Sequence, residues 1–202
     1  MSFNKFISKQ LSAPTGISGR IIGYFMNRQN IPLYQATIKH LQLSGGETIL
    51  DIGCGSGYVL NMIAQQQSGI FTGIDLSQSM INTATRRYKK HSNMTFHRQD
   101  LAAMAFPAGA FSHAYTINTV YFWGSPAATM QEIYRVLQPG GIFVNCFYSD
   151  KTLDRFAFTK HGYRRFPQAE LSAAGESAGF SLEILPILGG DALCYRYRKQ
   201  GR

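Results

Sequence analysis

Three alternating glycines form one turn of this sequence, and they restrict the possible fold more than any other pattern in it. A short apolar run, residues 48–52, has the composition of a buried strand, and Gly53, Gly55 and Gly57 follow it directly. Glycine permits a positive φ and a close approach of the backbone to a ligand. Residues 58–67 then have the spacing of a helix. A strand, a glycine-rich turn and a helix in this order predict a ligand-binding α/β unit, although an NAD-type turn and a merely tight connection remain alternatives.

Strand-like and helix-like segments alternate through the rest of the chain. Strands are predicted at 48–52, 69–75, 94–97, 110–117, 142–148, 181–186 and 192–198, and helices at 58–67, 77–90, 127–137 and 167–179. Strands separated by helices form a parallel sheet with helices on both faces. The last two strands are joined by too short a turn for a parallel crossover, so they should pair antiparallel. The predicted fold class is therefore α/β, a Rossmann-like three-layer sandwich with a mostly parallel seven-stranded sheet and an antiparallel last strand.

Two further helices are predicted before the first strand. Residues 17–28 carry apolar side chains at helical spacing. A second helix should begin at Asn30 and Pro32, which are typical of an N-cap and an early helical position, and stop at Gly45 and Gly46. We expect these helices to form an N-terminal helical cap at residues 1–45, followed by one catalytic domain at residues 46–202.

Composition excludes several classes of protein. No apolar run approaches the ~18–20 residues of a membrane span, and no secretory signal pattern is present. The three cysteines and five histidines have no metal-ligand spacing, which predicts no metal site and fits a reducing, cytoplasmic location. The net charge is +9, with basic clusters at Lys5–Lys39 (a stretch without acids), at 86–90 and at 196–202. These clusters either attract nucleic acid or anionic lipid, or form the solvated surface of an enzyme.

Two carboxylates follow strands of the predicted sheet. Asp75 ends the second strand, where it can accept hydrogen bonds from a ribose, or alternatively cap the helix that begins near Ser77. Asp100 and Leu101 follow the third strand, and a carboxylate there can accept a hydrogen bond from the amino group of an adenine. Because the carboxyl ends of parallel strands meet at one edge of a sheet, we expect both acids beside the glycine turn.

The ordered set of these motifs resembles the class I S-adenosylmethionine-dependent methyltransferase superfamily. The set comprises D-x-G-x-G-x-G at 51–57, the acid at 75, D-L at 100–101 and R-V-L-x-P-G-G at 135–141. The resemblance extends over residues 47–148 and the two terminal strands, and it is closest to small-molecule methyltransferases of the ubiquinone/menaquinone-biosynthesis type. It implies the cofactor S-adenosyl-L-methionine, bound by Asp51, Gly53, Gly55, Gly57, Asp75, Leu76, Met80, Asp100, Leu101 and Asn118.

The acceptor side of the site is less defined. Tyr121 and His161 are the candidates for a catalytic role, although an in-line methyl transfer depends mainly on positioning and does not require a fixed base. The aromatic run 121–123 would form either a wall against the acceptor or hydrophobic packing. Asn118 and Tyr121 resemble the ends of the N-P-P-Y element of amino-group methyltransferases, but both prolines are absent. The long connection 152–166 is predicted to cover the acceptor with the N-terminal helices; contact residues would be Tyr24, Tyr34, His161 and Tyr163.

Three functions follow from these patterns. The first is methyl transfer to a small-molecule acceptor by in-line displacement. The second is an RNA or protein methyltransferase, suggested by the charge of +9. The third is a non-catalytic protein that binds a nucleotide-like ligand with the same fold. The expected partner is a small-molecule acceptor, with RNA as the alternative; the sequence predicts no oligomeric state.

Overall fold

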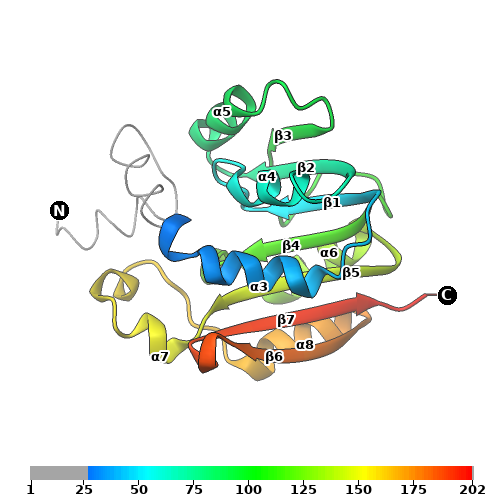
Figure 1. The fold of residues 1–202 in the computed structure, drawn as a ribbon. Coiled ribbons are helices and arrows are strands. Elements are labelled where there is room, and N and C mark those ends of the chain that lie inside the picture. Colours follow the sequence, from blue (N-terminus) through cyan, green and yellow to red (C-terminus); the bar gives the residue numbers. More distant parts are fainter. Residues whose placement is uncertain (1–26, 202) are drawn as a thin grey trace.

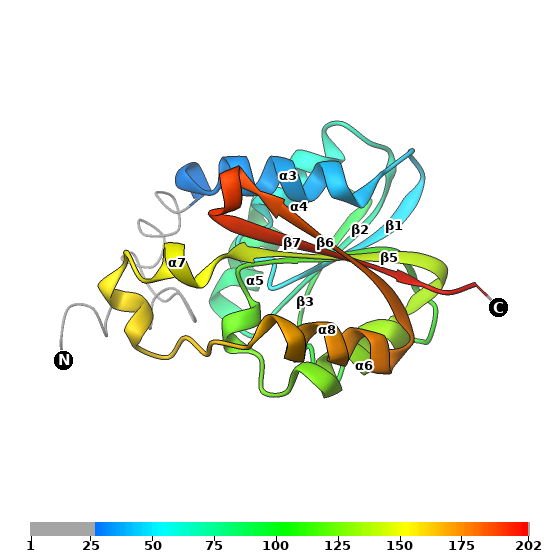
Figure 2. The same cartoon turned by 90° about the horizontal axis from the view of Figure 1, so that it is seen from below.

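The computed structural model describes residues 27–201, which contain one seven-stranded sheet covered by helices on both faces (Figures 1 and 2). The strands are β1 (Glu47–Ile52), β2 (Gly69–Asp75), β3 (Met94–Arg98), β4 (Phe111–Ile117), β5 (Leu137–Tyr148), β6 (Phe180–Ile187) and β7 (Ala192–Lys199). The α-helices are α3 (Ile31–Leu41), α4 (Tyr58–Ala64), α5 (Gln78–Arg87), α6 (Pro126–Val136), α7 (Asp150–Leu153) and α8 (Gln168–Ala178), and the 3-10 helices are η1 (Val120–Phe122), η2 (Ala157–Lys160) and η3 (Leu188–Gly190).

The strand order is β3-β2-β1-β4-β5-β7-β6. All pairs from β3 to β5 are parallel, whereas β7 runs antiparallel to both β5 and β6. The predicted fold class is confirmed, including the antiparallel last strand. The order reverses between β1 and β4, and ligands of open α/β sheets bind at the carboxyl ends of the strands where such a reversal occurs.

Two layers of helices bury the two faces of the sheet. Helices α3 and α4 lie on one face, and α6 and α8 lie on the other (Figure 2). Alternate residues of β1 separate accordingly: Ile49 packs in the cluster that contains Leu33 of α3, whereas Leu50 and Ile52 pack in the cluster that contains Met130 of α6. The alternation places Asp51 on the α3 face of the sheet.

Several predicted element boundaries differ from those in the structure. Helix α4 ends at Ala64 rather than at residue 67. Strand β5 begins at Leu137, because Leu137 already pairs with Phe111 before a bulge restores the regular register at Ile142. The connection 152–166, predicted without regular structure, contains the end of α7 and all of η2.

The N-terminal predictions are tested only in part. The helix predicted at 17–28 lies almost entirely outside the described residues. Helix α3 is confirmed and packs across β4, β5 and β7 (Figure 1), but it ends at Leu41, before Gly45. Asn30 makes no capping hydrogen bond with its side chain; its Oδ1 instead accepts a hydrogen bond of 2.8 Å from the Tyr148 hydroxyl. No helix within residues 27–201 has both the length and the apolar character to cross a membrane.

Close packing between α8 and β7 leads to a stability prediction. A Cβ added to Gly175 would collide with the ring of Tyr197, whose hydroxyl is tied to the Leu171 carbonyl oxygen at 3.2 Å. Overpacking of this kind costs ~1–3 kcal/mol, slightly offset by the better helix propensity of alanine. We expect Gly175→Ala to lower the free energy of unfolding in urea by about 1–2 kcal/mol. Ser177→Ala, at an exposed position of the same helix, should leave it nearly unchanged; equal values for both variants would contradict this packing.

Candidate active site

The glycine turn between β1 and α4 is fixed to the end of β2 by backbone hydrogen bonds. Gly53, Gly55 and Gly57 have φ values of 77°, 51° and 74°, in the left-handed region that favours glycine. The amides of Gly53 and Cys54 both donate to the carbonyl oxygen of Ile74, at 2.8 and 2.9 Å. These hydrogen bonds hold the turn at the carboxyl edge of the sheet, where the sequence predicts it.

The three glycines differ in what surrounds them. A Cβ on Gly53 would lie 2.5 Å from Thr119 Cγ2, and one on Gly57 would lie 2.8 Å from the Phe96 ring. A Cβ on Gly55 would meet no atom within 4 Å. Gly53 and Gly57 are thus required for packing within the protein, whereas the space in front of Gly55 is open to a ligand.

A cavity of about 120 Å³ opens in front of this turn. Its lining residues come from the turn, the helices on either side of it and strands β1 and β4: Asn27, Tyr34, Asp51, Gly53, Cys54, Gly55, Ser56, Tyr58, Val59, Tyr115 and Ile117. Three of the predicted cofactor-binding residues, Asp51, Gly53 and Gly55, therefore share one cavity with seven residues that were not predicted as site residues: Asn27, Cys54, Ser56, Tyr58, Val59, Tyr115 and Ile117.

Asp51 is the buried acid of this cavity. Its side chain is 4% exposed, and its Oδ2 accepts a hydrogen bond of 2.7 Å from the Tyr115 hydroxyl. Burial raises the pKa of Asp51 to about 7, although the hydrogen bond from Tyr115 acts in the opposite direction. Within residues 27–201 no cationic side chain lies within ion-pair distance of Asp51. A buried carboxylate of this kind attracts a positively charged ligand group.

Asp75 joins the glycine turn to the start of α5. Its Oδ2 accepts from the Gly55 amide at 2.9 Å, and its Oδ1 accepts from the Ser77 amide at 2.7 Å. Burial raises its pKa, and these two hydrogen bonds lower it. The hydrogen bond from the Ser77 amide supports the alternative interpretation, in which Asp75 caps the start of α5. It does not exclude ligand binding, because a carboxylate has about four acceptor positions and these amides occupy two.

Neither Asp75 nor the remaining predicted adenosine contacts line the 120 Å³ cavity. The Gln99 amide donates to the Asp75 carbonyl oxygen at 3.3 Å, which brings the segment after β3 beside the end of β2. There Asp100 is exposed and accepts from the Ala102 amide at 2.9 Å. Leu76 is 61% exposed, which is unusual for a leucine next to a buried strand end. Met80 is buried in α5, and Leu101 packs against the core cluster below α6.

Asn118, directly after β4, is held in the left-handed region with φ 57°. Its Oδ1 accepts from the Tyr148 amide at 3.3 Å and from the Tyr121 hydroxyl at 3.4 Å. The Tyr121 hydroxyl also lies 2.9 Å from the Tyr148 carbonyl oxygen. Asn118 thus ties the end of β4 to the end of β5 and to η1, a role that the sequence did not predict.

The structure separates the other sequence candidates. Trp123 is 1% exposed and belongs to the core, so it packs rather than forming a wall. Phe122 is 37% exposed and meets the ring of Tyr163 edge to face, with ring centroids 5.0 Å apart. Tyr34 lines the cavity. Tyr24 lies outside the described residues. His161 is exposed in the segment after η2, and neither this cavity nor the one described below includes it.

Tyr115 and Tyr58 were missed for different reasons. The contact between Tyr115 and Asp51 depends on the β1–β4 register, which pairs these two residues directly. The sequence contained the signal that Tyr115 occupies a polar strand near the reversal of strand order, but not its partner. Tyr58 starts α4 immediately after the glycine turn, so its proximity to a bound ligand was predictable from its position alone.

Comparisons with known proteins agree with this arrangement. Residues 49–141 match the family model of a methyltransferase domain. An uncharacterised methyltransferase of Bacillus subtilis is 30% identical over 122 residues, which are 60% of this chain and 67% of that protein. A sterol 24-C-methyltransferase of Gibberella zeae is 30% identical over 125 residues, 57% of this chain, but the match spans only 33% of that enzyme.

Among solved structures, a putative methyltransferase of Haloferax volcanii, in complex with the Trm112 methyltransferase activator, superposes with a TM-score of 0.81. It is 20% identical, and the match covers 99% of this chain and 100% of that one. At this identity the likeness concerns the fold. The family model and the sequence relatives place the chain in an enzyme class that transfers one-carbon groups. The chain belongs to the class I S-adenosylmethionine-dependent methyltransferase superfamily, and its cofactor is S-adenosylmethionine.

The described residues fit this cofactor. Its methionine part carries an ammonium group, for which the uncompensated Asp51 carboxylate is a suitable partner. Its ribose carries two hydroxyl donors, for which Asp75 retains acceptor positions. The open space before Gly55 leaves room for the ligand beside the backbone.

Proposed function

We propose that this enzyme transfers the methyl group of S-adenosylmethionine to a small-molecule acceptor, and that the cavity at the glycine turn holds the methionine part of the cofactor. The single observation that carries the proposal is the buried Asp51 carboxylate, which faces this cavity with a hydroxyl group as its hydrogen-bond partner. Asp75, with Leu76 and Met80 behind it, would hold the ribose and one side of the adenine. Asp100 and Leu101 would contact the other side.

Bound S-adenosylmethionine would supply a methyl group on a positively charged sulfur. The acceptor's nucleophilic atom would attack this methyl group in line with the carbon–sulfur bond, and that bond would break. The protein's contribution is then chiefly alignment of the two molecules, which can be worth ~7–11 kcal/mol. Tyr121 is not suited to be the general base, because burial raises its pKa well above the ordinary value and its hydroxyl lies within hydrogen-bond distance of the Tyr148 carbonyl oxygen. We propose a positioning role for Asn118 at the methyl end of the cofactor.

The division into a cap at residues 1–45 and a catalytic domain at residues 46–202 remains part of the proposal. Helix α3 packs directly on the sheet, so the described part of the cap contributes to the core as well as to the cavity, through Tyr34 and Asn27.

The second candidate is RNA methylation, and one surface favours it. Arg86, Arg87, Lys89 and Lys90 are all exposed at the end of α5 and just after it. A methyl-transfer screen with labelled S-adenosylmethionine separates the two proposals. We expect incorporation into members of a small-molecule library and none into total RNA. Incorporation into RNA, together with RNA binding that weakens steeply with salt, would favour the second candidate instead.

Gly55 allows ligand binding to be tested apart from folding. Gly55→Ala introduces a methyl group into open space at a positive φ, which costs about 1–2 kcal/mol in conformation. The added methyl group would project into the proposed cofactor space. We expect the dissociation constant of S-adenosylhomocysteine, measured by calorimetry, to rise by about 10-fold or more.

Gly109→Ala is the matched control for this substitution. Gly109 also has a positive φ, 70°, and open space around its Cβ position, but it lies before β4, at the opposite edge of the sheet. The two variants should lose similar stability, and only Gly55→Ala should lose affinity. Unchanged affinity in Gly55→Ala would place the cofactor elsewhere.

A further inference from the structure

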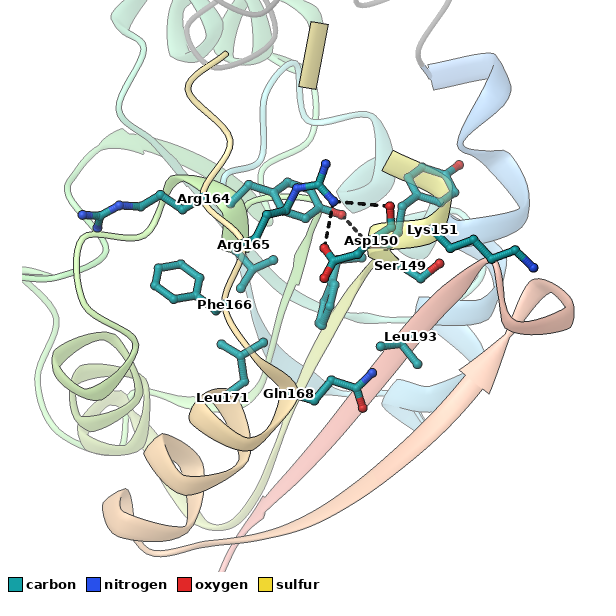
Figure 3. Close-up of a pocket in the computed structure, with 13 residues that line it drawn as sticks. Ser149, Asp150, Lys151, Arg164, Arg165, Phe166, Gln168, Leu171 and Leu193 are labelled. Atoms are coloured by element: carbon teal, nitrogen blue, oxygen red, sulfur yellow. Dashed lines mark hydrogen bonds and ion pairs between the residues drawn. The ribbon is translucent and has the colours of Figure 1, made fainter. Parts of the chain in front are cut away.

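A second cavity, of about 230 Å³, lies next to the proposed methyl end of the site (Figure 3). Ile117 lines the cofactor cavity and Val120, three residues later, lines the second one, so both cavities lie at the end of β4. Asn118, between these two residues, accepts hydrogen bonds from Tyr121 and Tyr148, both of which line the second cavity. The second cavity is therefore separated by one hydrogen-bond contact from Asn118, beside which we place the transferred methyl group.

The inner surface of this cavity is apolar and largely aromatic. Its apolar and aromatic lining residues come from η1, β5, β7, α8 and the segment just before α8: Val120, Tyr121, Phe147, Tyr148, Phe166, Leu171 and Leu193. A cavity of ~150 Å³ with apolar walls is enough to hold a benzene ring. The volume of about 230 Å³ is thus sufficient for a substituted ring.

The rim of the cavity is polar and carries a net positive charge. The charged residues that line the cavity are three cations, Lys151, Arg164 and Arg165, and one aspartate, Asp150. Arg165 is neutralised, because its guanidinium contacts Asp150 at 2.9 Å and Asp154 at 3.1 Å. In the part of the chain that the structure describes, neither Lys151 nor Arg164 forms an ion pair. Figure 3 shows the two side chains reaching outward on opposite sides of the cavity. The Arg164 guanidinium donates to the carbonyl oxygens of Trp123 and Gly124 at 3.0 and 2.6 Å, so Lys151 is the cation that we assign to an anion at the mouth.

Gln168 also lies at this mouth. It is the first residue of α8, is exposed, and points past Leu193 in Figure 3. Its amide adds an uncharged hydrogen-bonding group to the rim. The cavity thus combines an aromatic floor, which suits a flat apolar body, with a cationic mouth, which suits an anion.

We propose that this second cavity is the acceptor site, and that it takes a flat, ring-containing acceptor with an anionic substituent that stays at the mouth near Lys151. The inference rests on the proposed function, because the methyl group must come from a cofactor bound at the glycine turn. The ring would pack between Tyr121, Phe147 and Leu193, on the far side of Asn118 from the cofactor cavity.

The test uses 2-naphthoate as the anionic probe and 2-naphthalenemethanol as its neutral counterpart, each titrated into the full-length protein with saturating S-adenosylhomocysteine. We expect the wild-type protein to bind naphthoate at least several-fold more tightly than the alcohol. Gln168→Trp, which fills the mouth, should weaken naphthoate binding by about 10-fold or more. Ala169→Trp is its matched control, since Ala169 is exposed on the same helix and does not line the cavity.

The charge at the mouth is tested separately. Lys151→Glu should weaken naphthoate binding several-fold and leave binding of the alcohol unchanged. Lys160→Glu makes the same charge change at an exposed residue of the same segment that does not line the cavity, and its effect should be smaller.

Three results would overturn the inference: no binding of naphthoate, equal loss in both tryptophan variants, or equal affinity for the acid and the alcohol. The affinity for S-adenosylhomocysteine, measured in every variant, separates this outcome from failure of the proposed function. If the wild-type protein does not bind S-adenosylhomocysteine, the proposed function fails, whereas normal binding with any of the three results rejects only the acceptor site.

Discussion

Asp75→Ala should abolish most of the affinity for S-adenosylhomocysteine. We expect the dissociation constant to rise by about 100-fold or more, because the substitution removes the charged acceptor of the two hydrogen bonds that we propose from the ribose, at ~1.5–3 kcal/mol each. The substitution also releases the Gly55 amide, which Asp75 holds at 2.9 Å, so the turn itself becomes less ordered. Calorimetric titration with S-adenosylhomocysteine measures the effect directly.

Glu47→Ala provides a control for the loss of a carboxylate that holds a turn. Glu47, at the opposite end of β1 from the glycine turn, accepts hydrogen bonds from the amides of Ser44 and Gly45 at 2.6 and 3.0 Å. Its substitution should lower the thermal unfolding midpoint as Asp75→Ala does, yet leave the affinity unchanged. If both variants bind S-adenosylhomocysteine equally well, Asp75 has a capping role alone.

The affinity for S-adenosylhomocysteine should increase with pH through the pKa of Asp51. Burial raises this pKa to about 7, and the charged form is the one that attracts the ligand's ammonium. Below this pKa the carboxyl must lose its proton before it can bind, at a cost of about tenfold in affinity per pH unit. Affinity at pH 5 should therefore be about 100-fold lower than at pH 8. Calorimetry at several pH values checks this.

The stability of the ligand-free protein should respond to pH in the opposite sense. Because the folded pKa of Asp51 exceeds its ordinary value of 3.8, the folded state holds this proton more strongly than the unfolded state. The resulting stability is fully present below about pH 4 and is lost as pH rises through about 7. Asp51→Asn should remove this loss and most of the pH dependence of binding. The pH dependence of binding that remains in this variant should come from Asp75, whose pKa burial also raises. A wild-type affinity that does not vary between pH 5 and 8 would exclude Asp51 as the ammonium partner.

The sheet was predictable because local patterns determine it. Strand β2 was predicted with its observed bounds, since Gly69 and Asp75 flank an apolar run. The start of β5 was not, because Gln138 to Gly141 have the composition of a turn. These residues extend the strand only because Leu137 pairs with Phe111 far away in the sequence, and a local pattern cannot report such a pairing.

The candidate site was likewise predictable only in part. The glycine turn and Asp75 were predictable, because their positions after β1 and β2 bring them to one edge of the sheet. The hydrogen bond from Tyr115 to Asp51 and the two hydrogen bonds to Asn118 Oδ1 were not. They depend on the register between strands and on the left-handed conformation of Asn118, neither of which has a signature in residue type or spacing.

The position of β7 has a consequence for synthesis of the protein. Strand β7 is made after β6 but lies between β5 and β6, so β6 has no place in the sheet until residues 192–199 have left the ribosome. A nascent chain that ends before Ala192 leaves the β5 edge open and α8 without the Tyr197 ring that packs against Gly175. Exposed strand edges promote aggregation. This half of the sheet therefore depends on the timing of translation more than the half around the glycine turn does.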